Sequence, residues 1–113
     1  MNYRKIFKTS SLLQKVLSEV IQNEVRNPLV HPLTTISRIS LSKDLRYAKV
    51  FITIFAEEEK QEESIRGLEH SSSFIEIMSS RRVRLPYFPK LRFFLDREAK
   101  KRERIDALLE AII

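Results

Sequence analysis

Apolar side chains recur along the chain with two periods, and each period predicts a different kind of element. In the first part of the chain the spacing is three and four residues, which is typical of an amphipathic helix. The apolar positions of this helix are Leu13, Val16, Leu17, Val20 and Ile21. Ser10 or Ser11 is expected to cap its start. Asn27-Pro28 is expected to end it, because the residue before a proline is disfavoured in helical geometry.

Alternating apolar and polar positions then predict two strands joined by a turn. The first strand is expected near Thr34–Ser42, where imperfect alternation around Ile36 and Ile39 allows a bulge. Ser42-Lys43-Asp44-Leu45 is typical of a hairpin connection, with Asp44 as a natural turn former. The next strand has the cleanest alternation in the sequence. One of its faces consists of Ala48, Val50, Ile52 and Ile54, and the other of Tyr47, Lys49, Phe51, Thr53 and Phe55.

A second helix and a third strand complete the predicted fold. The acidic run Glu57–Glu63 should open the helix, since negative charge is favourable near a helix N-terminus. At Ser71–Ser73 the serine hydroxyls compete for backbone hydrogen bonds, which predicts a kink or break before the helix ends near Arg82. The third strand carries Leu91, Phe93 and Leu95. This order predicts an α+β fold in which a three-stranded sheet packs against helices on one face.

Composition favours binding over chemistry. A chain of 113 residues allows one domain with one modest core. It has no cysteine and a single glycine, Gly67, so cysteine-based sites and glycine-rich phosphate loops are excluded. His31 and His70 lie far apart and outside any ligand-spaced motif, so we expect no metal, no cofactor and no enzymatic activity. No leader peptide or membrane-spanning segment is visible, which leads us to expect a cytoplasmic protein.

The distribution of charge indicates a polyanionic partner. Residues 1–56 carry a net charge of +6, residues 57–70 a net charge of −4, and residues 71–113 a net charge of +4. Two basic regions therefore flank an acidic patch, and such a surface attracts a polyanion in one orientation. A merely well-solvated surface is the alternative, and we favour the polyanion.

Basic residues supply the candidate contacts, because guanidinium groups suit phosphate. One basic cluster follows the second helix and comprises Arg81, Arg82, Arg84, Lys90 and Arg92. Within it, Tyr87 and Phe88 either stack on unpaired bases or close the core, and we favour the core for both. A further basic run lies in the tail at Lys100, Lys101, Arg102 and Arg104, where a solvated tail is an equally good explanation.

Several segments in order resemble the ribosome-binding factor A family, whose members have a KH-like fold of the bacterial form. The resemblance rests on Glu24-Val25-Arg26-Asn27-Pro28, the hairpin Ile39–Val50, Arg84-Leu85 with Pro89–Asp96, and Arg104–Leu109. It implies a type II KH-like RNA-binding domain over residues 1–96 and a charged tail or terminal helix over residues 97–113. The chain departs from the family in two places. Ser71–Ser73 stands where the family has an Ala-x-Gly kink, and Glu76 replaces a basic residue beside the expected RNA groove.

The resemblance implies a bacterial assembly factor that acts in growth in the cold. Such a protein binds the free or immature 30S small subunit and its 16S rRNA, assists maturation of the 5′ end region, and has no small-molecule substrate. We expect a monomer. The predicted main RNA contact consists of Ser71, Ser72 and Ser73 with Arg81, Arg82 and Arg84, supported by Lys90 and Arg92. A second predicted contact consists of Lys43, Arg46 and Lys49.

Three other functions compete with this interpretation. A general KH-like RNA-binding module would have another RNA target and would prefer short single strands. A protein adaptor would act through the acidic run Glu57–Glu63, and its binding would not depend on salt. A nuclease is disfavoured by the inventory of residues.

Overall fold

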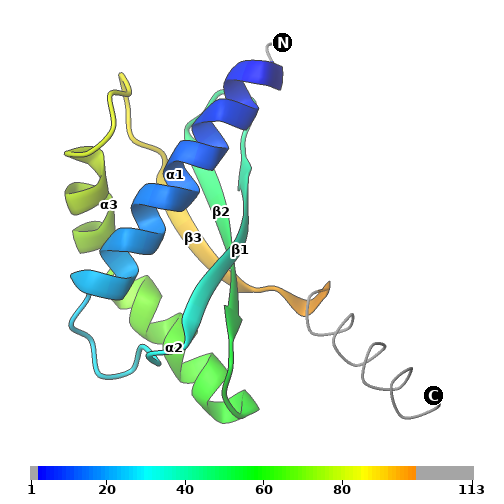
Figure 1. Ribbon diagram of the computed structural model, residues 1–113, viewed down its shortest axis with the longest axis vertical. Helices are drawn as coiled ribbons and strands as arrows, with labels where there is room; N and C mark the ends of the chain where they lie inside the picture. Colours follow the sequence, from blue (N-terminus) through cyan, green and yellow to red (C-terminus); the bar gives the residue numbers. More distant parts are fainter. Residues whose placement is uncertain (1–2, 99–113) are drawn as a thin grey trace.

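The computed structural model describes residues 3–98, and in them helices cover one face of a three-stranded sheet (Figure 1). The elements in chain order are α1 (Tyr3–Asn23), β1 (Thr34–Leu41), β2 (Tyr47–Ile54), α2 (Glu58–His70), α3 (Ser72–Ser80) and β3 (Lys90–Leu95). The predicted α+β class and element order are confirmed. The predicted tail falls almost entirely outside the described residues. No helix within them is long and apolar enough to cross a bilayer.

Strand β2 lies at the centre of the sheet, antiparallel to β1 and parallel to β3. A parallel neighbour needs a crossover connection, and α2 with α3 provides it. The register of β1 shifts between Ile36 and Arg38, so one extra residue sits opposite β2 there. The predicted bulge is therefore present. It lets side chains on both sides of Ser37 keep their proper faces.

The core lies between the helices and the inward face of the sheet. All four predicted inward residues of β2 are buried, as are the five predicted apolar residues of α1. Leu68 of α2, Ile75 of α3, and Leu91 and Phe93 of β3 complete this cluster. The two periods in the sequence therefore identified most of the core correctly, because each aligns its apolar residues on one face.

Helix α1 differs from the prediction at both ends. It begins at Tyr3 rather than at Ser10 or Ser11, because no glycine or proline interrupts the preceding residues and capping preference is only a local tendency. It ends at Asn23, four residues before Asn27. The Asn27 side chain instead organises the following turn, where its Oδ1 accepts a hydrogen bond of 2.9 Å from the backbone N–H of Leu29.

The predicted break between the two halves of the second helix lies at Ser71. Its φ of −92° and ψ of 4° end α2, while its carbonyl accepts the first hydrogen bond of α3 from the N–H of Ile75. This kink needs no left-handed residue. Within residues 3–98 the only residue with a positive φ is Leu45, in the β1–β2 turn, so serine occupies the kink without backbone strain.

Gly67 allows the loop after α1 to pass close to α2. A Cβ atom at this position would lie 2.9 Å from Cγ2 of Val30 and 3.0 Å from Cβ of Leu29. The Gly67 carbonyl also accepts a hydrogen bond of 3.3 Å from Nδ2 of Asn27. The glycine is thus required for close approach, and not for an unusual backbone angle.

Replacing Gly67 with alanine should destabilise the protein, although alanine is the better helix former. Overpacking of this kind costs about 1–3 kcal/mol, which exceeds the gain of about 1 kcal/mol in helix propensity. Urea denaturation of G67A would measure the loss. The exposed α2 position Glu62 is the control, since E62A should change the stability by about 0.5 kcal/mol or less. A G67A protein as stable as the parent would contradict the close-packing account.

Candidate nucleic-acid interface

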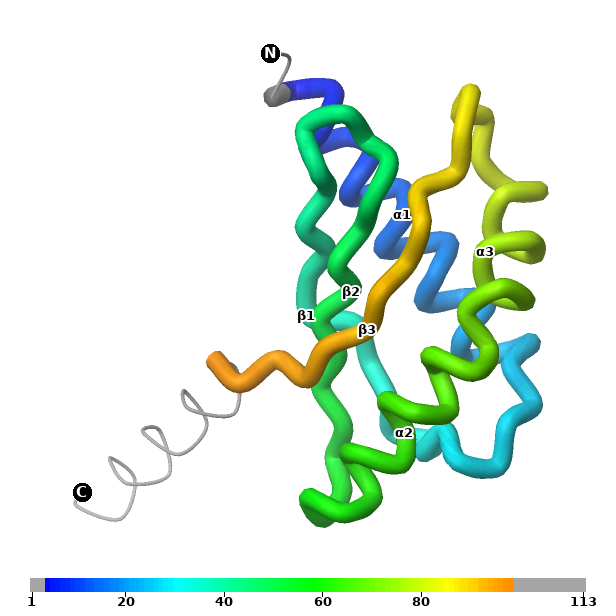
Figure 2. Tube along the Cα trace, turned by 180° about the vertical axis from the view of Figure 1, so that it is seen from behind, coloured from blue at the N-terminus to red at the C-terminus, as the bar shows by residue number. Residues whose placement is uncertain are grey.

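Basic groups from distant parts of the sequence gather at one end of the molecule. The β1–β2 turn and the loop of residues 81–89 both lie at the end opposite the start of α2 (Figures 1 and 2). A hydrogen bond of 2.8 Å from the N–H of Lys90 to the carbonyl of Arg46 joins the two regions. The side chains of Lys43, Arg46, Arg84 and Lys90 are all exposed there.

The β1–β2 turn is held by its own polar side chains. The Ser42 hydroxyl donates to Oδ1 of Asp44 at 2.7 Å, and the N–H of Arg46 donates to the same oxygen at 3.1 Å. The Ser42 hydroxyl oxygen also accepts from the N–H of Tyr47 at 3.0 Å. Two hydrogen bonds lower the pKa of Asp44. The larger effect comes from the Ser42 hydroxyl and the smaller from the backbone N–H of Arg46. The turn therefore presents Lys43 and Arg46 from an ordered backbone.

The three arginines after α3 have different surroundings. Arg82 forms an ion pair with Glu24 at the end of α1, so its charge is partly neutralised and it fastens α3 to α1. Arg81 is exposed, and its side chain makes one polar contact to a described residue, of 3.8 Å from Nη1 to the sulfur of Met78. Arg84 is exposed and has no hydrogen bond or ion pair within residues 3–98. Arg81 and Arg84 are thus the members of this cluster that are available to phosphate.

The aromatic residues of the same loop separate into two roles. Phe88 is partly buried against the core next to the fully buried Pro89, as predicted. Tyr87 is 83% exposed, so the predicted core position is wrong for this residue. Only one of two adjacent side chains can point inward as the loop crosses the end of the core.

The outward face of the sheet carries the remaining predicted basic residues. The register places Lys49 of β2 beside Arg92 of β3, and Tyr47 beside Lys90. Arg92 also lies 3.5 Å from Glu69, which reduces its net charge. The sequence prediction omitted Arg38, whose β1 position aligns with Phe51. Its place opposite Phe51 depends on the bulge between Ile36 and Arg38, which shifts the register of β1 by one residue.

Ser71–Ser73 lies apart from the arginines. The serines begin α3 and Arg81 follows its end, so the nine residues of the helix separate them by about 13 Å. Ser71 instead borders a shallow groove with Phe74 and the segment after α1. Its hydroxyl accepts a hydrogen bond of 3.4 Å from Nδ2 of Asn27. The structure therefore does not bring the predicted main contact together as one cluster.

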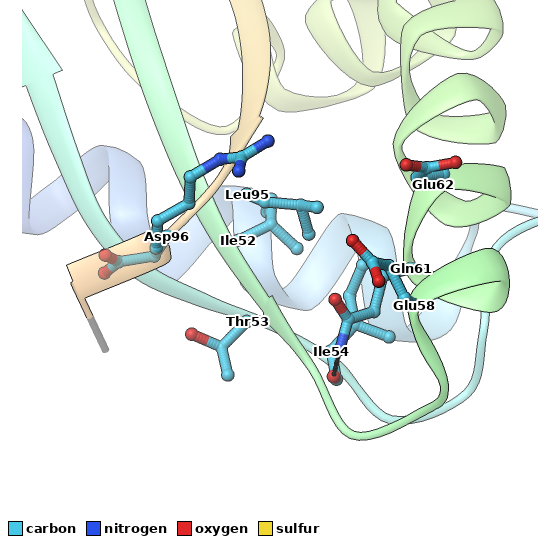
Figure 3. Close-up of a pocket in the computed structure, with 9 residues that line it drawn as sticks. Ile52, Thr53, Ile54, Glu58, Gln61, Glu62, Leu95 and Asp96 are labelled. Atoms are coloured by element: carbon cyan, nitrogen blue, oxygen red, sulfur yellow. Dashed lines mark hydrogen bonds between the residues drawn. The ribbon is translucent and has the colours of Figure 1, made fainter. Parts of the chain in front are cut away.

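The opposite end of the sheet is acidic. Figure 3 shows Glu58, Gln61 and Glu62 of α2 on one side of the strands, facing Ile52 and Ile54, with Thr53 and Asp96 directed away. Nε2 of Gln61 donates to the carbonyls of Ala56, at 2.8 Å, and Ile54, at 3.3 Å, which fixes the start of α2. No group of three acidic or histidine side chains within residues 3–98 is arranged to hold a metal ion. A polyanion would therefore be repelled from this end and attracted to the other.

Comparisons with known proteins identify the family. Residues 5–109 match the family described as Ribosome-binding factor A. The chain is 44% identical to the Ribosome-binding factor A of Protochlamydia amoebophila over 99% of this chain and 86% of that protein. The Chlamydia pneumoniae relative is 37% identical over 94% of this chain and 89% of that protein. The chain belongs to the ribosome-binding factor A family.

Solved structures of the family share this fold. The crystal structure of ribosome-binding factor A from Thermus thermophilus is similar with a TM-score of 0.71 and 30% identity, over 80% of this chain and 94% of that one. A Thermus thermophilus ribosome-binding factor A homology model, fitted into the cryo-EM map of a 30S complex, has a TM-score of 0.62 and 30% identity. That comparison covers 75% of this chain and 88% of the other.

Glu76, where the family resemblance leads us to expect a basic residue, has a structural role in this chain. Its Oε2 accepts a hydrogen bond of 3.1 Å from the N–H of Leu91, on the edge of β3 that no strand covers. Oε1 of Glu69 accepts a second bond, of 2.9 Å, from the N–H of Phe93. Two helix carboxylates thus satisfy alternate N–H groups of the edge strand. A basic residue at position 76 could not do so, because lysine has no acceptor.

Restoring a basic residue at position 76 should therefore weaken the fold. We expect E76K to lose about 1–3 kcal/mol of stability, since the N–H of Leu91 would be left without an acceptor. E76Q keeps a side-chain oxygen and should lose less. Urea denaturation of both variants measures the difference. Equal stability of E76K and E76Q would show that the hydrogen bond to β3 does not matter.

The turn that presents Lys43 and Arg46 should depend on the Asp44 oxygen. D44A should accelerate amide hydrogen exchange at Arg46, because its N–H loses its acceptor, whereas D44N retains an oxygen and should exchange nearly as slowly as the parent.

The hydrogen bonds to Asp44 also predict how its contribution to stability changes with pH. The pKa of Asp44 is lower in the folded protein than in the unfolded chain, so the ionised carboxylate stabilises the fold above the unfolded pKa. This stabilisation is lost as the pH falls through the folded pKa. An NMR titration of the Asp44 carboxyl should therefore give a midpoint below 3.8. A midpoint at or above that value would contradict the turn geometry.

Proposed function

We propose that this protein is a ribosome assembly factor that binds the free or immature 30S small subunit through its 16S rRNA. It assists maturation of that RNA, including processing in the 5′ end region. Its role is to hold an RNA arrangement by shape and phosphate contacts, without chemistry of its own. We further propose that residues 1–96 form the RNA-binding domain, that the protein is a cytoplasmic monomer, and that it needs no cofactor.

The observation that carries this proposal is the separation of charge along the molecule. The β1–β2 turn and the loop after α3 gather exposed cations at one end, while the Glu57–Glu63 run lies at the other. Such an arrangement orients a protein on a polyanion. The similarity to a Thermus thermophilus protein fitted into a 30S complex supports ribosomal RNA as that polyanion.

Each predicted residue receives a role from its surroundings. Exposed Arg81 and Arg84 make the main phosphate contacts, and Arg82 positions them through its ion pair with Glu24. A second contact consists of Lys43, Arg46 and Lys49, and Lys90 and Arg92 extend it across the sheet. A separate contact consists of Ser71, Ser72 and Ser73. The small groove beside Ser71 is bordered by exposed Arg26, which supplies a cation for phosphate there.

Reversing Arg81 and Arg84 tests this proposal. We expect R81E/R84E to abolish cosedimentation with free small subunits, since two phosphate contacts become repulsive. The parent protein should cosediment with free small subunits at low salt, less strongly at moderate salt, and not with assembled ribosomes. Phosphate contacts weaken steeply as salt rises.

A double variant of equal charge change provides the control. K15E/K60E alters exposed residues of α1 and α2 outside the proposed contacts and should still bind the particle. Circular dichroism must show that both variants are folded. Unchanged binding by folded R81E/R84E would defeat the assignment of these arginines. Preference for short RNA over ribosomal particles would favour a KH-like module with another target, and binding insensitive to salt would favour a protein partner.

A further inference from the structure

The face of the sheet turned away from the helices has the composition of a surface that binds unpaired bases. The strand register places outward side chains in rows across the sheet. The first row contains Tyr47 and Lys90, the second contains Ser40, Lys49 and Arg92, and the third contains Arg38, Phe51 and Phe94. Aromatic and cationic side chains thus alternate along β2, while β3 carries two cations followed by Phe94.

The third row offers two neighbouring planar surfaces. The guanidinium carbon of Arg38 lies 3.7 Å from the centre of the Phe51 ring, so the arginine covers the outer face of that ring. The rings of Phe51 and Phe94 are 5.9 Å apart between centroids and tilted by 32°. Phe94 is 40% exposed. A base can therefore stack on the Phe94 ring, on the Arg38 guanidinium plane, or on both.

A third aromatic surface lies at the hairpin end of the same face. Tyr47 is 60% exposed and sits four residues before Phe51 on β2, a separation of about 13 Å along the strand. Between the two aromatic rows lie Lys49 and Arg92. This order would let phosphates meet the cations while bases stack on either side of them.

The charge of this face selects the kind of occupant. The rows carry four cations, Arg38, Lys49, Lys90 and Arg92, and the charge of Arg92 is partly neutralised by its ion pair with Glu69. Asp96, which follows β3 at the border of the face, is 5% exposed and accepts a hydrogen bond of 2.7 Å from Ser37. A double helix keeps its bases stacked internally and could use the cations but not the rings.

We propose that this open sheet face binds a single-stranded RNA segment by stacking its bases on Tyr47, Phe94 and the Arg38–Phe51 pair. The inference deepens the proposed function, on which it rests: it adds a base-dependent contact to the phosphate contacts at the basic end. The rings serve recognition of unpaired nucleotides, and the cations between them hold the backbone.

The experiment compares two RNAs that differ only in their bases. Fluorescence anisotropy would measure binding of a single-stranded RNA of about 10 nucleotides and of the same strand with abasic sugars. The parent should bind the base-bearing strand at least about fivefold more tightly, which is the lower range for one base–aromatic stack. Y47L/F94L keeps apolar side chains on the sheet and removes two of the three stacking surfaces, so it should clearly reduce the preference for base-bearing RNA while RNA binding stays salt-dependent.

Phe55 supplies the matched control, because it is 61% exposed, close to the 60% of Tyr47, but it follows the end of β2 and borders a groove with Ile21 and Leu33. F55L should keep the full preference for base-bearing RNA. Equal binding of the two RNAs by the parent, no binding of either, or an undiminished preference in folded Y47L/F94L would overturn the inference.

Cosedimentation of the same proteins separates this inference from the proposed function. A parent that binds small subunits but shows no preference for base-bearing RNA would refute the stacking surface alone. A parent that prefers base-bearing RNA but binds no ribosomal particle would refute the assembly role and leave the stacking surface supported.

Discussion

The pairing of β2 with β1 on one side and β3 on the other is the constraint on which the rest of the structure depends. Its inward residues form the centre of the core, and its outward residues align the cations and rings of the open face. A slip of one residue would exchange these two sets, burying Lys49 and exposing Val50. The hydrophobic effect therefore fixes the functional face indirectly, because burying the apolar set leaves only one register for the polar one.

Strand β3 places a second demand on the chain. Because it is parallel to β2, the chain must cross over the sheet, and the broken helix α2–α3 makes that crossing. The outer edge of β3 would then expose unpaired N–H groups, but the carboxylates of Glu69 and Glu76 accept hydrogen bonds from two of them. Glu76 thus has two opposing effects: its charge disfavours RNA binding when considered alone, but its hydrogen bond supports the strand that carries Lys90 and Arg92.

The segregation of charge follows from the same topology. Hairpin and parallel crossover bring the β1–β2 turn and the loop after α3 to one end, although about 40 residues of sequence separate them. The acidic start of α2 must lie at the other end, since β2 runs the length of the sheet before it. The proposed function requires no reactive group. It requires cations and planar side chains held on a rigid sheet, which is how many proteins recognise unpaired RNA.

The sequence by itself determined the class of fold, the element order, the break at Ser71 and most of the core, because periodicity and turn chemistry are local properties. It also predicted basic residues as the candidate RNA contacts. Tertiary structure decided which of them are available: Arg82 is taken by Glu24, Tyr87 points outward, and Ser71–Ser73 lies at the far end of α3 from Arg81. Only the bulge and the pairing of three strands bring Arg38, Phe51 and Phe94 together. These outcomes depend on contacts between residues far apart in sequence, which no local pattern contains.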